Sequence, residues 1–548
     1  MSETGRKILG ASLAVMLAHV IFKAAGFIQA RVIGHYCDPV TRDLFYFALQ
    51  SVVWTFFLIG EEGLGPAFLP VFMGEMDKRG ESAAWRFASS LFTVQTLLIA
   101  LVVTAVMCRP ETVVRLFSDW DNPKAVAVYM ERAPDFVRWM IPALFALSIG
   151  STTYLVLNGY KRFFLAAFGD AAVKFLIIAA VLLGIWQGGA LQPWLILGVV
   201  AGSLAKLFTH LLGMRREAGR FRPSLALRTP AWGRFSLLVL PLLVGILFAK
   251  VRDLYNDTWI LTHTGEAGLF SANAYGKKIF NGVGQLVPYS VSIAMFPFFC
   301  ELVDRERRKE LAELVLRGSS IVWVFLVPVT AVVVALSLPL SRLLFQTGRF
   351  DLLACRQAAV ANACYTLVLP FFALEYLFMQ AFFSNRKMVT PVLVGILFSS
   401  LSMGLSWLGV VRLGLRGSAA VATVGLAYTV SRTLKTVSLG LLMRRFLPDL
   451  DAGKAARFAL RMLLAGCAAG GAAYGARWAY ESRIDVYAGR GEGSVIGLVL
   501  PCLAISALTG GAAYLGALRI LCPAEWRETL RWTRARLAGR GRFKKDAP

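Results

Sequence analysis

Hydrophobic positions along the chain gather into blocks of about 20 residues that are separated by short polar connections. An α-helix needs about 20 apolar residues to cross the roughly 30 Å of hydrocarbon in a bilayer, so each block predicts one membrane span. The pattern therefore predicts an all-α integral membrane protein with about fourteen transmembrane helices. We expect the spans at residues 8–34, 44–74, 85–108, 136–159, 163–187, 190–214, 235–262, 267–300, 314–340, 353–384, 389–411, 417–443, 455–479 and 493–521.

The first block, residues 8–34, is longer than the hydrophobic region of a signal peptide and is followed directly by a second block. We therefore expect it to be a retained span. The composition agrees with a membrane chain, because hydrophobic residues fill 57% of the 548 positions and charged residues only 17%. Soluble domains carry about 25% charged residues.

Positive charge is concentrated in alternate connections, whereas residues 186–193 between spans 5 and 6 carry no charge. The positive-inside rule then places both termini of this multi-pass membrane protein in the cytoplasm. The net charge of +25 thus follows from topology and from attraction to anionic membrane lipids, and we expect no nucleic-acid partner. The connection after span 6 alone contains Arg215, Arg216, Arg220, Arg222, Arg228 and Arg234.

The two halves of the chain resemble each other at an offset of about 225–231 residues. Arg86 and Arg317 open spans 3 and 9 in similar segments, and Lys23 and Lys250 are counterparts in spans 1 and 7. Six spans separate the copies, so two lobes of equal orientation are predicted, related by an axis along the membrane normal. We expect an N-lobe at residues 1–222, a C-lobe at 223–450, two additional helices at 451–521 and a basic cytoplasmic tail at 522–548.

Ionisable residues at membrane depth are costly and usually face a bundle interior or a watery cavity. The pattern places them mainly in spans 1, 2, 7 and 8, where lysines outnumber the nearby acids. This excess predicts a cationic cavity that neutralises an anionic headgroup, most simply a phosphate. The candidate substrate-binding residues are Lys23, Lys250, Arg252, Lys277, Lys278, Asn281 and Gln285.

Span 2 contains the segment GEEGLGP at residues 60–66, which predicts a break in the helix. Such a break needs neighbouring groups to satisfy the freed backbone polar atoms. Glu61 and Glu62 in this segment, together with Asp43 at the start of the span, are candidates for charge compensation or for a gate.

Span 7 carries two aspartates, Asp253 and Asp257, on the face that also bears Lys250. They are the candidates for coupling transport to an ion gradient. The alternative is that Arg252 or Lys250 pairs with Asp253 and that these charges lock the lobes together.

Arg31 and Arg42 lie near the predicted ends of spans 1 and 2. Long basic side chains near helix ends commonly extend toward the membrane interface, and we expect this of both residues. They are therefore left out of the predicted cavity.

The chain shows no pattern typical of an enzyme or a metal protein. Its eight cysteines include no CxxC pair, and its four histidines form no metal-binding cluster. We expect no catalytic residue, no metal and no cofactor.

Several segments make the chain similar to the MurJ (MviN) lipid II flippase family, within the superfamily of multidrug and polysaccharide-lipid exporters. The resemblance rests on ARVIG at residues 30–34, DLFYFA at 43–48, EEGLGPAFLP at 61–70, LFQTGRF at 344–350 and AFFSNRKMVTP at 381–391. Asp43 keeps an aspartate of the family, and Lys278 stands where the family has an arginine in span 8. The family's first-span arginines are largely absent from residues 19–25, and its arginine late in span 2 is missing from residues 52–57.

The resemblance implies two six-helix lobes around a central cationic cavity, with the last two helices forming a groove for a prenyl tail. It implies alternating access that carries an undecaprenyl-pyrophosphate-linked glycan lipid from the inner to the outer leaflet. It leaves cell-wall synthesis and division proteins open as partners.

We expect a lipid-linked oligosaccharide flippase, with lipid II as the first candidate cargo. Another polyprenyl-linked glycan, of O-antigen or capsule type, is the alternative cargo. A multidrug/cation antiporter would need an acidic cavity, and a non-transporting scaffold would not need the lysines. Both fit the lysine-rich spans less well than a flippase does.

Overall fold

The chain is almost entirely helical. The computed structural model describes residues 21–123, 126–160, 162–284, 295–296, 298–385, 387–486, 492–523 and 526–527. Within these residues the only β-type pairing is a single bridge between Thr347 and Phe350. Nine helices of the described part are long and apolar enough to cross a membrane, or up to eleven spans when each of two bent pairs is counted as one. The all-α membrane fold is thus confirmed, while the number fourteen stays a prediction.

The helices form two compact units. Unit 1 comprises Met1–Lys278, Leu344–Ala358 and Gly395–Ala427, and unit 2 comprises Ile279–Leu343, Ala359–Val394 and Tyr428–Pro548. The predicted lobe boundaries near residues 222 and 450 stay a prediction.

Unit 1 begins, in its described part, with a helix at residues 21–36. Asp38 then starts the next helix by accepting a hydrogen bond from the Thr41 backbone N–H at 3.0 Å, with Pro39 at the first helical position. The helices that follow are α2(Pro39–Tyr46), η1(Phe47–Val53), α3(Trp54–Arg79), α4(Glu81–Cys108), α5(Pro110–Phe117), α6(Val128–Met140), α7(Ala143–Gly159), α8(Phe163–Trp186), α9(Leu191–Gly213), η2(Ala218–Arg220), α10(Pro230–Leu254), η3(Tyr255–Trp259), α11(Ile260–Thr262) and most of α12(Leu269–Gly284).

The predicted break in span 2 is wrong. Helix α3 runs without interruption from Trp54 to Arg79 and contains Pro66 and Pro70. Gly63 serves close packing instead: a Cβ added there would lie 2.9 Å from Leu243 Cδ2 of α10. The glycine therefore lets two helices approach each other and does not end one of them.

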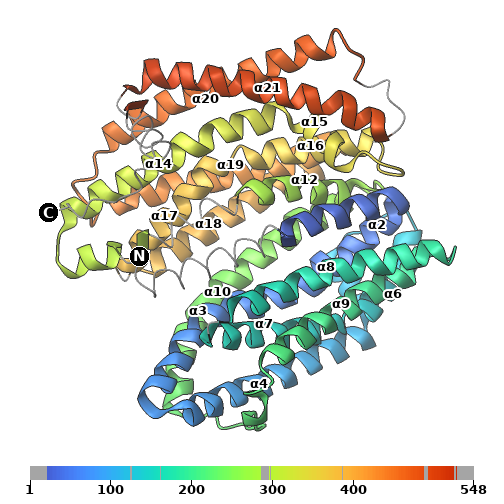
Figure 1. Cartoon of the computed structure of the whole chain (residues 1–548), viewed down its shortest axis with the longest axis vertical. Helices are drawn as coiled ribbons and strands as arrows, with labels where there is room; N and C mark the ends of the chain where they lie inside the picture. The colour runs from blue at the N-terminus through green and yellow to red at the C-terminus, as the bar shows by residue number, and fades with distance from the viewer. Residues whose placement is uncertain are drawn as a thin grey trace. The chain divides into compact units, whose positions relative to one another are not determined.

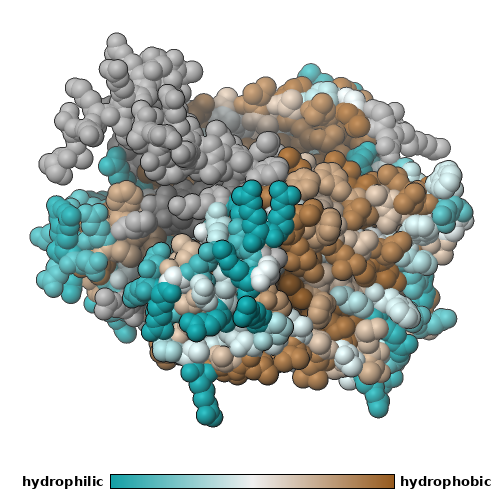
Figure 2. Space-filling view, turned by 60° about the horizontal axis from the view of Figure 1, so that its bottom comes forward, coloured by the Kyte–Doolittle hydropathy of each residue, from teal (hydrophilic) through white to brown (hydrophobic). Residues whose placement is uncertain are grey.

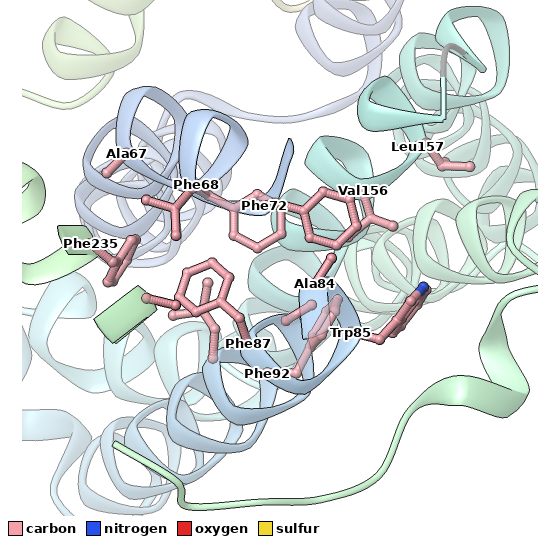
Figure 3. Close-up of a cluster of buried hydrophobic side chains, with 14 of the residues drawn as sticks. Ala67, Phe68, Phe72, Ala84, Trp85, Phe87, Phe92, Val156, Leu157 and Phe235 are labelled. Carbon is pink, nitrogen blue, oxygen red and sulfur yellow. The ribbon is translucent and has the colours of Figure 1, made fainter. Parts of the chain in front are cut away.

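An aromatic core holds α3, α4, α7 and α10 together (Figure 3). Phe68 and Phe72 stack at a centroid distance of 5.2 Å, and Phe68 also stacks on Phe87 at 5.7 Å. Phe235 of α10 meets the edge of Phe87. Rings in such offset and edge-to-face contacts add to the stabilisation that burial of their area provides.

Unit 2 is built around α14 and two long helices at the C-terminal end, which lie side by side in Figure 1. Gly510 allows their close approach, because a Cβ there would lie 2.9 Å from the Ala469 carbonyl oxygen. Tyr514 donates a hydrogen bond to the Val324 carbonyl of α14 at 2.7 Å. Four helices lie wholly in this unit: α14(Arg308–Ala335), α17(Leu369–Ser384), α20(Ala452–Glu481) and α21(Glu492–Leu521). Four more are shared with unit 1: α15(Ser337–Phe345), α16(Leu352–Thr366), α18(Val389–Ser406) and α19(Gly417–Met443). The π-helical turn η4(Trp407–Arg412) lies in unit 1.

Large hydrophobic side chains cover much of the outer surface. Leu237, Leu508 and Ile520 are each at least three-quarters exposed. Figure 2 shows hydrophobic residues over much of the visible face and hydrophilic residues gathered in separate patches. An apolar exterior of this kind suits hydrocarbon and not water, as expected for a multi-pass membrane protein.

Candidate functional site

Three of the predicted cavity cations have carboxylate partners. Lys250 of α10 contacts Glu62 of α3 at 2.8 Å. Arg252 contacts Asp253, its neighbour in the chain, at 2.6 Å. Arg252 and Asp253 therefore form the ion pair that the sequence offered as an alternative to a headgroup-binding arginine.

Lys277 of α12 pairs with Asp257 of η3. Both side chains are only about one-fifth exposed, so this pair is largely removed from solvent. A carboxylate beside an ammonium group cancels most of its field, and the pair contributes less to anion binding than a lone lysine would.

Two other lysines at membrane depth lie against aromatic rings. Lys174 of α8 is buried, with its Nζ 4.8 Å from the ring centre of Trp54 and 5.5 Å from that of Phe22. Lys278 of α12 lies 5.2 Å from the ring of Tyr46 and 5.8 Å from that of Tyr275. A ring face attracts a cation without cancelling its charge.

Within the described part of the chain, neither Lys174 nor Lys278 forms an ion pair with a carboxylate. Asp170 lies one turn before Lys174, but its Oδ1 is 2.5 Å from the Nζ of Lys206 in α9. The positive charge of Lys174 and Lys278 is therefore not compensated by an ion pair.

Lys174 is also close enough to both Lys278 and Lys23 for their charges to interact. The three lysines come from the first helix, α8 and α12, and together they form what we call the lysine cluster. Positive charges at these positions repel one another, and an anion placed among them would relieve the repulsion.

Asp43 connects three segments near the start of α2. Its carboxyl group accepts hydrogen bonds from the Tyr129 hydroxyl at 2.7 Å, from the Gly268 N–H at 2.7 Å and from the Ser271 N–H at 2.8 Å. Gly268 and Ser271 lie at the beginning of α12, where backbone N–H groups have no partner within the helix. Asp43 thus caps α12 from a distant part of the chain.

The expectation that Arg42 extends to the membrane interface is wrong. Its side chain is buried and donates to the Cys37 carbonyl at 3.2 Å and to the Arg349 carbonyl at 3.0 Å. Its guanidinium group also lies 4.9 Å from the ring centre of Phe350. Arg31 likewise donates to a backbone carbonyl, that of Leu344, at 3.4 Å. Both arginines hold chain segments together, because buried carbonyls need donors.

The remaining predicted residues are placed as follows. Glu61 is half-buried in α3 and interacts electrostatically with Lys206, Asp170 and Lys250. Asn281 is a half-buried residue of α12. Gln285 lies outside the described residues.

Two π-helical turns meet beside the paired charges. The Ser51 hydroxyl of η1 lies 2.7 Å from the Thr258 hydroxyl of η3. Asn256 of η3 donates to the Ser402 hydroxyl of α18 at 2.9 Å. Single π-helical turns inside longer helices occur often at functional sites, since the extra residue changes the direction of the following side chains.

Sequence reasoning missed the charges of spans 5 and 6. These spans contain single polar residues within apolar helices, namely Asp170, Lys174, Lys206 and His210. The imidazole of His210 is buried and lies 2.9 Å from the Thr153 hydroxyl. The same criterion that selected spans 1, 2, 7 and 8 applies to them. Charged residues inside the membrane are therefore not confined mainly to those four spans, because spans 5 and 6 carry them as well.

The long apolar helices and the apolar exterior of the described residues define a multi-pass membrane protein. The family model described as "Lipid II flippase MurJ" matches residues 37–486. The chain belongs to this family, and the resemblance drawn from its motifs is confirmed.

Named relatives agree with this assignment. A "Probable lipid II flippase MurJ" of Borreliella burgdorferi is 21% identical over 419 residues, 76% of this chain and 81% of the relative. One of Haemophilus influenzae is 23% identical over 484 residues, 86% of this chain and 92% of the relative.

Solved structures show the same fold. "Lipid II flippase MurJ, inward closed conformation" superimposes with a TM-score of 0.71 at 16% identity, over 94% of this chain and all of that one. An inward-facing multidrug resistance MATE family transporter of the MOP superfamily gives 0.64 at 13% identity, over 80% of this chain and 98% of that one.

Proposed function

We propose that this protein flips an undecaprenyl-pyrophosphate-linked glycan lipid, with lipid II as cargo, from the inner to the outer leaflet of the bacterial inner membrane. No bond is made or broken in this process. Both termini lie in the cytoplasm, and the two six-helix lobes alternate between inward-facing and outward-facing states. Membership of the lipid II flippase family and the relatives' names support this cargo.

The lysine cluster is the observation that carries the proposal. A pyrophosphate headgroup must leave water to cross the membrane, so it needs donors and positive charge inside the protein. Lys174 and Lys278 offer both, because each lies against aromatic rings and neither forms an ion pair with a carboxylate in the described part of the chain. Lys23 adds a third cation. These side chains do not form the acidic cavity that a cation antiporter would need.

The other predicted binding residues have secondary roles in this proposal. Lys250, Arg252 and Lys277 already have carboxylate partners, so they attract the headgroup mainly when those pairs open. Asn281 and Gln285 would offer hydrogen bonds to the sugar part of the cargo.

Asp43 is the gating residue of the proposal. Its hydrogen bonds hold α2 against α6 and against the start of α12, and so keep this end of unit 1 closed. Glu61 and Glu62 compensate the charge of Lys206 and Lys250 and exchange partners as the lobes move.

Energy coupling is assigned to Asp253 and Asp257. Each carboxylate pairs with a cation, and Asp257 belongs to the π-helical turn η3. An ion or proton that competes for these carboxylates would release Arg252 and Lys277 toward the headgroup. Helices α20 and α21 would guide the prenyl tail.

Transport in proteoliposomes tests the proposal directly. Fluorescent lipid II is incorporated, and the fraction accessible from outside is measured over time with protein and with empty vesicles. The expected result is faster exchange with wild-type protein, lost in the Lys174→Ala/Lys278→Ala variant and kept in Lys309→Ala, which changes an exposed lysine of α14. Folded wild-type protein that flips no lipid II would overturn the assignment.

The absence of the family's arginines from spans 1 and 2, and the lysine in place of one at Lys278, favour one alternative cargo, another polyprenyl-linked glycan. Complementation of a strain depleted of its lipid II flippase separates the two. Growth supports lipid II, whereas failure of a well-expressed protein favours the other glycan.

A further inference from the structure

Unit 2 contains a cavity of about 620 Å³ where α14, α17, α19 and α20 meet. The apolar part of its lining, called the floor below, includes Trp323, Leu374, Phe378, Leu441 and Phe458. The Trp323 indole N–H is bound to the Pro370 carbonyl at 3.1 Å, so the ring presents its apolar face and needs no polar partner from a ligand. A cavity of this size accommodates a ligand of several hundred daltons.

The rim of the same cavity is strongly basic. None of the described residues that line it is acidic, whereas five are cationic: Arg317, Arg444, Lys454, Arg457 and Arg461. This contrasts with unit 1, in which several buried cations have carboxylate partners. A group of cations beside an apolar surface favours a ligand that carries both a negative charge and an apolar part.

The rim cations belong to helix segments that lie close together in the fold. Arg444 follows the end of α19 directly, and Lys454, Arg457 and Arg461 occupy one face of the first turns of α20. Two of them are held weakly by neighbouring groups: Lys454 lies 3.8 Å from Asp451, and Arg457 Nε donates to the Gly453 carbonyl at 3.3 Å. Both contacts are on the exposed surface and easily exchanged.

We propose that this cavity binds an anionic phospholipid of the membrane, with its phosphate at the basic rim and an acyl chain on the apolar floor. The rim belongs to connections that the distribution of charge assigns to the cytoplasmic side. A phospholipid of the inner leaflet presents its phosphate at that depth and its chains toward the hydrocarbon. Along two helices the lining has the same order, because Arg317 of α14 and Arg444 after α19 are nearer the cytoplasmic ends than Trp323 and Leu441. A free phosphate would leave the apolar floor uncovered.

This site is distinct from the lysine cluster, all of whose residues lie in unit 1, and it does not depend on the proposed cargo. The bound lipid would fill the space between α19 and α20 and so attach the last two helices to the rest of unit 2. It is a resident lipid and not a transported one.

Native mass spectrometry of the purified full chain tests the proposal. The protein is incubated with phosphatidylglycerol or with phosphatidylcholine of the same acyl chains, and the retained lipid is counted. We expect phosphatidylglycerol to be retained at least fivefold more, and Arg457→Gln/Arg461→Gln to lose most of that preference. The matched control Arg215→Gln/Arg216→Gln removes two exposed arginines outside the cavity and should keep it.

A second variant, Ala455→Trp, fills the apolar part without removing a charge. It should also reduce retention, while an unchanged Tm in detergent shows that the protein is folded, whether or not it flips lipid II. Equal retention of both lipids, equal retention by wild type and both variants, or displacement of the lipid by millimolar inorganic phosphate would overturn the proposal. Preferential retention of polyprenyl pyrophosphate would also overturn it, by assigning the cavity to the transport path.

Discussion

The lysines inside unit 1 fall into two groups that differ in what lies beside them. Lys206 sits 2.5 Å from a carboxylate, that of Asp170, and its side chain is only 3% exposed. Lys174 and Lys278 lie against the rings of Trp54 and Tyr46 instead. A cation with a carboxylate partner holds two helices together, whereas a cation on a ring keeps its field and can bind an anion. The difference separates stability from function among residues of the same type.

Removal of the carboxylate from the first group should have the largest effect. Asp170→Asn removes the ion-pair partner of the buried Lys206 ammonium. Because Glu61 also interacts with Lys206 and the Asp170 side chain is 38% exposed, we expect a cost of up to about 3 kcal/mol. Thermal unfolding in detergent should show a clear decrease in Tm. Asp121→Asn, at an exposed pair with Arg115, is the control and should change little. An unchanged Tm in Asp170→Asn would remove the distinction between the two groups.

Lys278→Met should have the next largest effect, on transport alone. The methionine keeps the apolar stem against Tyr46 and Tyr275 but removes the charge, so folding is preserved. We expect the rate of lipid II flipping to fall about 100-fold, equivalent to about 2.7 kcal/mol, with Tm nearly unchanged. Flipping at the wild-type rate would show that this lysine does not contact the headgroup.

Asp43→Asn should have an intermediate effect. The amide replaces one acceptor oxygen by a donor that faces the N–H groups of Gly268 or Ser271, and a mismatched buried group costs about 1–3 kcal/mol. Flipping should fall about tenfold. A spin label at the start of α12 should show a larger population of the state in which this end of α12 has moved away from α2. Asp38→Asn, which leaves these contacts in place, is the comparison.

Lys250→Met should have the smallest effect. Its partner Glu62 is about half exposed, so the pair is solvated and contributes under about 1 kcal/mol. Flipping should decrease less than threefold. A loss as large as that of Lys278→Met would place Lys250 among the headgroup-binding residues, as the sequence alone suggested.

Several long helices were predictable from the sequence because they are apolar segments with polar ends. The expected spans 136–159 and 353–384 were only partly right, because each falls in a pair of helices that meet at a bend of 42°. Helix α19(Gly417–Met443), for example, has the predicted bounds, and α8(Phe163–Trp186) differs by one residue. The π-helical turns were not predictable, since their hydrogen bonds depend on neighbours such as the Ser51–Thr258 contact between distant segments.

The site was predicted only in part, for a similar reason. Periodicity identifies Lys250, Lys277 and Lys278 as buried cations but says nothing of what each faces, because helix packing decides that. Lys277 and Lys278 are adjacent, yet one meets Asp257 and the other meets Tyr46. Arg42 shows the same limit: its carbonyl partner Arg349 is 307 residues away.

The capping of α12 by Asp43 has a consequence for the energetics of opening. If α2 separates from α12, the N–H groups of Gly268 and Ser271 lose their acceptor, and water must replace it. Opening at this end is therefore coupled to an influx of solvent molecules. Osmolytes that lower water activity should slow it, and the slope of that dependence should be shallower in a variant that lacks the Asp43 carboxylate.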